Sequence, residues 1–142
     1  MASGRSDAEI EKKWGKDALS LGWTPIPTAL LLLQNDIGLT AVEMNILIHL
    51  LSHWWKVDDK VYPSQDSIAG RMGVSKRTVQ RGIDRLESLK IIEVQSTPRS
   101  GKYHGKNIYD LRPLSLILEQ NAPHLRYRME MTKGRKVGSS HE

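Results

Sequence analysis

Residues Tyr62–Leu89, YPSQDSIAGRMGVSKRTVQRGIDRLESL, predict two short helices joined by a tight turn. Ser64 follows Pro63 and can accept a hydrogen bond from a free backbone N–H at the start of the first helix. Gly73 stands where that helix ends, because glycine adopts a positive φ without strain. Ser75 can cap the second helix in the same way. This second helix carries one apolar stripe at helical spacing, formed by Val79, Ile83, Leu86 and Leu89.

The small and apolar residues of this stretch have the spacing of a helix-turn-helix. Ala69 is small enough to let two helices cross closely, and Gly73 follows four positions later. Val74 then supplies an apolar side chain after the turn. Each of these positions meets a separate geometric requirement, so the pattern is specific.

Outside its apolar stripe, the second helix has a basic face. Arg77, Arg81 and Arg85 recur every four residues, and like charges at that spacing destabilise an isolated helix. An anionic partner would remove this cost. Thr78 and Gln80 add hydrogen-bonding groups suited to base edges, and arginine is the commonest contact to guanine. The alternative is an ordinary solvated basic face; the surrounding motif favours DNA.

The stretch PSQDSIAGRMGVSKRTVQRGIDRLESLKII, residues 63–92, resembles the winged helix-turn-helix family of bacterial and phage regulators and of plasmid or phage replication-initiation proteins. The resemblance runs from about Leu39 to Leu111 and implies a DNA-binding module. Gly82 departs from the family pattern, and inside a helix it costs about 1 kcal/mol relative to alanine. Close packing or close approach to DNA would explain it. The shared residues are Pro63, Ser64, Ile68, Ala69, Gly73, Val74, Ser75, Thr78, Val79, Leu86, Leu89 and Ile92.

The charge distribution agrees with a nucleic-acid partner. The net charge is +5, but Met1–Tyr62 carries six basic and eight acidic residues, whereas Arg71–Arg112 carries ten basic and four acidic ones. The absence of cysteine fits a reducing cytosol. The N-terminus lacks a secretory signal, and the longest apolar run, Ala29–Leu33, is too short to cross a bilayer. We therefore expect a soluble, cytoplasmic, nucleoid-associated protein without membrane contact.

The N-terminal third is less informative. Residues 1–12 read as a mobile tail, although Ala8–Leu21 has the spacing of a short amphipathic helix. Thr24–Pro27 is expected to be an extended linker because of its prolines. Thr28–Gln34 is either a short helix or a strand, since periodicity cannot decide for so brief an apolar run. Asn35–Gly38 is expected to be a turn.

A further helix begins at Thr40. Thr40 and Glu43 match a capping box, in which side chains and backbone satisfy each other's free groups. Val61 and Tyr62 are expected to add a short strand to the wing sheet. The apolar residues that place this helix against the helix-turn-helix are Met44, Leu47, Ile48, Leu51 and Trp55.

A β-hairpin wing is predicted after the second motif helix. Lys90–Gln95 and Asn107–Leu111 alternate as strands do, and Ser96–Lys106, STPRSGKYHGK, is a glycine-rich basic loop. Its cations suit contacts to phosphates or to the minor groove; the alternative is an ordinary exposed loop. The basic residues of the loop are Arg99, Lys102, His104 and Lys106.

The C-terminal segment predicts a helix that starts at Pro113 and breaks or kinks at Pro123. Its apolar residues, together with the tryptophans upstream, predict a homodimer interface or a cover for the same core. Thr132–Glu142 is expected to be disordered. The domain division is then 1–38 as N-terminal tail and helical extension, 39–112 as winged helix-turn-helix domain, 113–131 as C-terminal helical extension and 132–142 as tail.

Catalytic and metal motifs are weak. His49 and His53 have the i, i+4 spacing of zinc ligands, but a third ligand is lacking, and two structural histidines are the better interpretation. There is no phosphate-binding glycine loop, serine nucleophile elbow or spaced carboxylate pair. We expect a protein that is not an enzyme and has no cofactor and no metal. Whether it has a small-molecule effector is left open.

The sequence thus predicts a mainly α fold with a small β-hairpin wing (α+β), a winged helix-turn-helix with N- and C-terminal helical extensions. The expected function is sequence-specific binding of double-stranded DNA by a small transcriptional regulator. Alternatives are a plasmid or phage replication-initiation or partition factor, and a winged domain that binds protein. The predicted DNA-contacting residues are Ser64, Gln65, Ser75, Lys76, Arg77, Thr78, Gln80, Arg81, Arg85, Arg99, Lys102 and Lys106.

Overall fold

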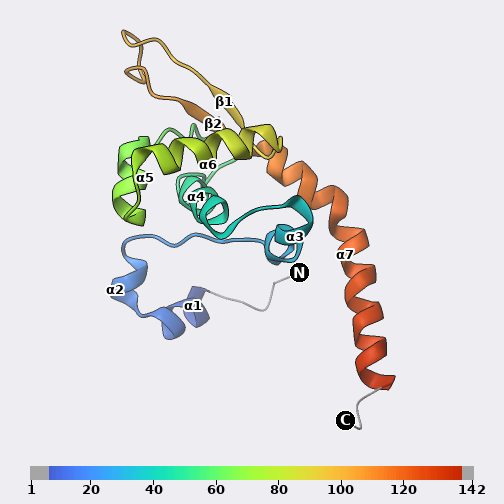
Figure 1. Ribbon diagram of the computed structural model, residues 1–142. Coiled ribbons are helices and arrows are strands. Elements are labelled where there is room, and N and C mark those ends of the chain that lie inside the picture. Colours follow the sequence, from blue (N-terminus) through green and yellow to red (C-terminus); the bar gives the residue numbers. More distant parts are fainter. Residues whose placement is uncertain (1–6, 139–142) are drawn as a thin grey trace.

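The computed structural model describes residues 7–138, with side chains to residue 134. It is mainly helical with one two-stranded antiparallel sheet, as predicted (Figure 1). None of the described helices is both long enough and apolar enough to cross a membrane. The elements in chain order are α1 (Asp7–Trp14), α2 (Lys16–Leu19), α3 (Thr28–Ile37), α4 (Ala41–Leu51), α5 (Gln65–Met72), α6 (Lys76–Ser88), β1 (Glu93–Gln95), β2 (Ile108–Asp110) and α7 (Arg112–Gly138).

Helices α4, α5 and α6 form the centre of the fold, and each begins at the residue that the sequence predicts. Thr40 Oγ1 accepts from the Glu43 backbone N–H at 3.1 Å, and Glu43 Oε1 accepts from the Thr40 N–H at 3.0 Å. The hydroxyls of Ser64 and Ser75 cap α5 and α6. Gly73 ends α5 with φ 71°. The predicted helix-turn-helix geometry is therefore present.

Gly82 lies where α6 meets α4. A Cβ atom at this position would overlap the Cδ1 atom of Ile46, which is completely buried in α4. Of the two explanations offered for this glycine, close packing is the one that the structure supports, because Gly82 is on the buried side of α6. The missing side chain allows the two helices to approach.

The two paired strands of the wing are shorter than predicted. Only Glu93–Gln95 and Ile108–Asp110 pair as strands, with Val94 opposite Tyr109. Ile91 and Ile92 are buried in the core, and Lys90 adopts φ 60° at the end of the helix. Val61 forms the predicted additional bridge, next to Tyr109.

One helix from each predicted extension contributes to the core. The undecided segment is a helix, α3, which continues to Ile37, so the predicted turn at Asn35–Gly38 is wrong; only Gly38, with φ 89°, leaves the helix. Helix α7 packs against α3, and these two helices share one core with the helix-turn-helix. The buried residues of these two helices are Leu30, Leu33, Leu114, Leu118 and Leu125.

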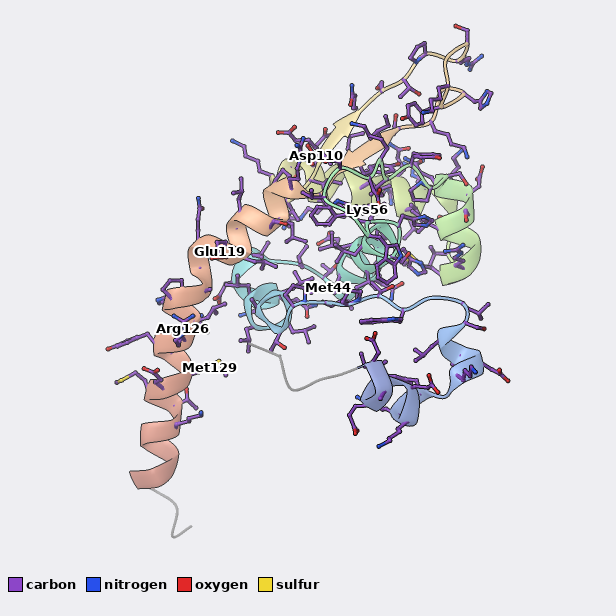
Figure 2. The ribbon with its side chains drawn as sticks, turned by 180° about the vertical axis from the view of Figure 1, so that it is seen from behind. Met44, Lys56, Asp110, Glu119, Arg126 and Met129 are labelled. Atoms are coloured by element: carbon purple, nitrogen blue, oxygen red, sulfur yellow. The ribbon has the colours of Figure 1, made fainter. Side chains whose placement is uncertain are left out.

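Helix α7 is also longer than predicted. It begins at Arg112, continues through Pro123, and extends to Gly138, so neither a break at Pro123 nor a disordered segment from Thr132 is observed. Proline removes one helical hydrogen bond. Beyond Pro123, α7 still contacts α3, where Arg128 Nη1 lies 2.6 Å from Asp36 Oδ2. The last residues of the predicted tail, 139–142, lie outside the described residues. Figure 2 shows α7 from behind, with Glu119, Arg126 and Met129 along it.

The predicted amphipathic helix over Ala8–Leu21 is divided into two. Gly15, with φ 90°, separates α1 from α2, and neither short helix has a buried residue. Residues 7–12, which were predicted as a mobile tail, are part of α1, while residues 1–6 lie outside the described part of the chain. The linker at Thr24–Pro27 is extended as predicted.

We predict that Gly82→Ala destabilises the fold, although alanine is the better helix former. The overlap with Ile46 in a closed core is expected to cost about 1–3 kcal/mol, more than the gain of about 1 kcal/mol in helix propensity. The matched control is Gly70→Ala on α5, where a Cβ meets nothing within 4 Å and stabilisation is expected. The free energy of unfolding is measured by denaturant titration.

The same measurement on the double variant Gly82→Ala, Ile46→Val tests the cause. Valine lacks the overlapping Cδ1 atom, so the alanine should cost less in this background than in the wild type. An equal cost in both backgrounds would show that the α4–α6 contact is not responsible.

Candidate nucleic-acid interface

The outer face of α6 is basic and directed away from the core. Val79, Gly82, Ile83 and Leu86 are buried, and Arg77 and Arg81 are exposed on the opposite side of the helix. Among the described residues, neither Arg77 nor Arg81 forms an ion pair. Two guanidinium groups one turn apart therefore face solvent without an acidic partner.

The polar residues at the start of α6 also cap this helix. Ser75 Oγ accepts from the Thr78 N–H at 3.1 Å and lies 3.0 Å from Thr78 Oγ1. Ser75 is exposed, whereas Thr78 is half-buried. Both predicted contact residues are thus engaged in capping, and a nucleic acid at the start of α6 would meet side chains that are already ordered.

The remaining polar residues of α6 have partners within the protein. Lys76 Nζ lies 3.6 Å from Asp66 Oδ2 on α5, and both side chains are well exposed. Gln80 Nε2 donates to Asp84 Oδ1 at 3.4 Å. Arg85 is different from the two free arginines, because its Nε lies 3.7 Å from Glu43 Oε2 on α4 and the Glu43 side chain is only 14% exposed.

The start of α5 and the base of the wing adjoin the start of α6. An open pocket of about 300 Å³ lies between them and brings together five of the twelve predicted contact residues, namely Ser64, Gln65, Lys76, Gln80 and Lys106. Ser64 Oγ accepts from the Ser67 N–H at 3.0 Å. Gln65 at the start of α5 and Tyr109 of β2 both line this pocket, so the helix adjoins the hairpin here. Burial raises the pKa of the Tyr109 hydroxyl, against the effect of hydrogen bonds from Gln65 and Asn107.

The wing loop presents the predicted cations Arg99, Lys102 and Lys106, all exposed. The hairpin projects beyond the α5–α6 pair, with the loop at its far end (Figure 1). The structure adds two aromatic residues that sequence reasoning did not assign to the site. The rings of Tyr62 and Tyr103 lie 5.0 Å apart at an angle of 68°. No local pattern indicates this pair, because its members come from distant parts of the chain.

The two histidines with the spacing of zinc ligands are His49, on α4, and His53, which follows the end of α4. His49 is half-buried, and His53, just beyond the helix, is exposed. Burial lowers the pKa of both imidazoles, and the nearby charge of Arg71 lowers it further. Within residues 7–134, no group of three or more histidine, aspartate or glutamate side chains could hold a metal ion.

Comparison with known proteins agrees with this geometry. Residues 38–92 match a family model described as a helix-turn-helix domain. No curated protein matches the chain. One solved structure, titled "Crystal Structure of MarR", is 21% identical, and the alignment covers 80% of this chain and 81% of that chain with a TM-score of 0.41. Residues 38–92 thus resemble a helix-turn-helix domain, and in the structure the β1–β2 hairpin follows them as the wing of a winged helix-turn-helix fold.

Proposed function

We propose that the protein binds duplex DNA sequence-specifically and regulates transcription. The observation that carries the proposal is the pair Arg77 and Arg81, exposed opposite the buried stripe of α6 and without an acidic partner among the described residues. Arginine contacts guanine O6 and N7 through two parallel hydrogen bonds. The major groove is about 12 Å wide and admits an α-helix.

The other polar residues receive different roles. An exposed ion pair such as Lys76–Asp66 is worth less than about 1 kcal/mol, so a DNA phosphate can replace the aspartate. Arg85 is held by the partly buried Glu43, and we assign it to fixing α6 on α4 more than to DNA. Ser64, Gln65 and the wing cations would contact the backbone on either side of the helix. The proposal gives the protein no catalytic role.

We also propose that the protein binds as a homodimer. Helices α3 and α7 expose apolar side chains on their outer surface, and Leu31 and Met129 are 57% and 48% exposed. An open pocket of about 370 Å³ between these helices is lined largely by apolar atoms of Leu32, Leu125 and Met129. An apolar surface of this kind, remote from the basic face, suits a second copy of the chain.

Selection of bound sequences from random duplex DNA separates regulation from the replication alternative. One inverted repeat with half-sites about one helical turn apart is expected for a two-fold dimer acting on an operator. Tandem direct repeats would favour an origin-binding or partition factor. The selection is made at roughly physiological salt, because affinity for DNA depends strongly on ionic strength.

We predict that Arg77→Ala and Arg81→Ala each weaken binding to the selected site by about 1–3 kcal/mol, because a bidentate contact to guanine is lost. The measurement is fluorescence anisotropy with the selected duplex and with single-base variants of it. Relaxed discrimination at one base pair is expected for each variant. Arg126→Ala on α7 removes the same charge elsewhere and should bind normally. Unchanged selectivity in both α6 variants would contradict their roles.

For the wing, we predict that Lys102→Ala weakens binding similarly for all sequences. Loss of one phosphate contact should make the plot of log affinity against log salt shallower by about one. The control is Lys56→Ala, an exposed lysine in the turn after α4. A loss confined to a single base pair would show that Lys102 contacts a base.

For the dimer, we predict that Met129→Glu raises the dissociation constant at least about tenfold, because a carboxylate would be buried in an apolar contact. Molar mass is measured by light scattering at several concentrations. Val57→Glu, at a position 64% exposed in the turn after α4, is the control. A monomeric wild-type protein at micromolar concentration would exclude the dimer.

A further inference from the structure

We propose that Tyr62 and Tyr103 form a clamp that holds the wing loop, residues 96–107, in its DNA-binding position. The inference rests on the proposed function and adds a positioning role to it. In this account the two rings act by orienting the loop lysines. They therefore determine affinity without themselves contacting DNA.

The wing loop needs such a restraint. The paired strands end at Gln95 and Ile108, so the loop begins where the β-ladder stops. An unrestrained cationic loop would lose conformational entropy each time it bound a phosphate, and this loss would subtract from affinity. A loop that is ordered before binding avoids most of that cost.

Hydrogen bonds within the loop fix its shape, but other contacts must attach the loop to the rest of the protein. The Pro98 carbonyl accepts from the Gly101 and Gly105 N–H groups at 3.0 and 3.1 Å. The Thr97 hydroxyl donates to the Lys106 carbonyl at 2.6 Å. All of these partners belong to the loop itself. They fold it into a compact unit, which still requires an anchor on the helical body.

The tyrosine pair supplies this anchor. Tyr103 belongs to the loop, whereas Tyr62 lies between Val61, whose carbonyl accepts from the Tyr109 N–H at 2.8 Å, and the segment that caps α5. The Tyr62 backbone is therefore fixed by the sheet on one side and by a helix start on the other. The edge-to-face packing of the rings at 5.0 Å transfers this rigidity to the loop.

The same rings orient two of the predicted DNA-contacting lysines. Lys102 Nζ lies 5.7 Å from the centre of the Tyr103 ring, and Lys106 Nζ lies 6.0 Å from the centre of the Tyr62 ring. These are cation–π distances. Removal of either ring would release the loop and leave a lysine without its packing surface.

The first test measures DNA affinity at constant salt for Tyr103→Ala, Tyr103→Phe and the double variant Tyr103→Ala, Lys102→Ala. We expect a loss of about three- to tenfold for alanine and near-normal affinity for phenylalanine, which keeps the ring. In the Tyr103→Ala background, Lys102→Ala should cause little further loss, because the lysine is already misplaced. Fully additive losses would overturn the clamp.

The matched control breaks another edge-to-face pair. Trp23 and Trp55 pack at 6.0 Å and 85°, and Trp23 lies in the linker before α3 instead of in the wing. Trp55→Ala removes one ring of an edge-to-face pair as Tyr103→Ala does, although Trp55 is exposed and Tyr103 is half-buried, and it should leave DNA affinity unchanged. An equal loss in this variant would show a general effect on the fold and would overturn the clamp.

The second test needs no DNA. Limited trypsin digestion of the free protein, followed by mass spectrometry, reports how readily the bonds after Arg99 and Lys102 are cleaved. Tyr103→Ala should accelerate these cleavages about tenfold or more, while Tyr103→Phe and Trp55→Ala should not. Unchanged cleavage in Tyr103→Ala would overturn the clamp even if the wild-type protein binds DNA. A wild-type protein that fails to bind DNA would instead overturn the proposed function, and the role of the clamp with it.

Discussion

The close crossing of α4 and α6 determines how the rest of the structure is arranged. Gly82 has no side chain, and a Cβ atom there would overlap Ile46 in the core. Successive residues of an α-helix are separated by about 100°, so the position of Gly82 against α4 also sets the direction of every other side chain on α6. Val79 and Ile83 lie on the same buried side of α6 as Gly82, and Arg77 and Arg81 are exposed on the other side.

The surrounding elements hold the basic face in a fixed relation to the wing. Arg85 connects α6 to the capping box of α4 through Glu43, and Gln65 at the start of α5 lines the same pocket as Tyr109 of the hairpin. Helices α3 and α7 contact each other and complete the hydrophobic core. A duplex that contacts both α6 and the wing would therefore meet groups whose relative positions exist before binding, which lowers the entropic cost of association.

Local features of this fold are predictable from the sequence, and long-range ones are not. The caps at Thr40, Ser64 and Ser75 and the turn at Gly73 depend on residues within four positions, and the structure confirms them. Helix α3 packs against α7, a contact between distant segments that the local sequence of α3 does not indicate. The Tyr62–Tyr103 and Arg85–Glu43 contacts join distant segments, and no spacing rule indicates them. The predicted DNA contacts remain predictions, although the geometry now distinguishes the free arginines from the paired ones.

In the proposed complex with DNA, the outer face of α6 contacts base edges in the major groove. Methylation interference on the selected duplex tests it most directly, because methyl groups on guanine N7 lie in the major groove and those on adenine N3 lie in the minor groove. Methylation of one or two guanines at N7 in each half-site should prevent binding, and Arg77→Ala or Arg81→Ala should remove this sensitivity at one of them. Binding that is insensitive to N7 methylation throughout the site would exclude contacts of α6 with guanine in the major groove.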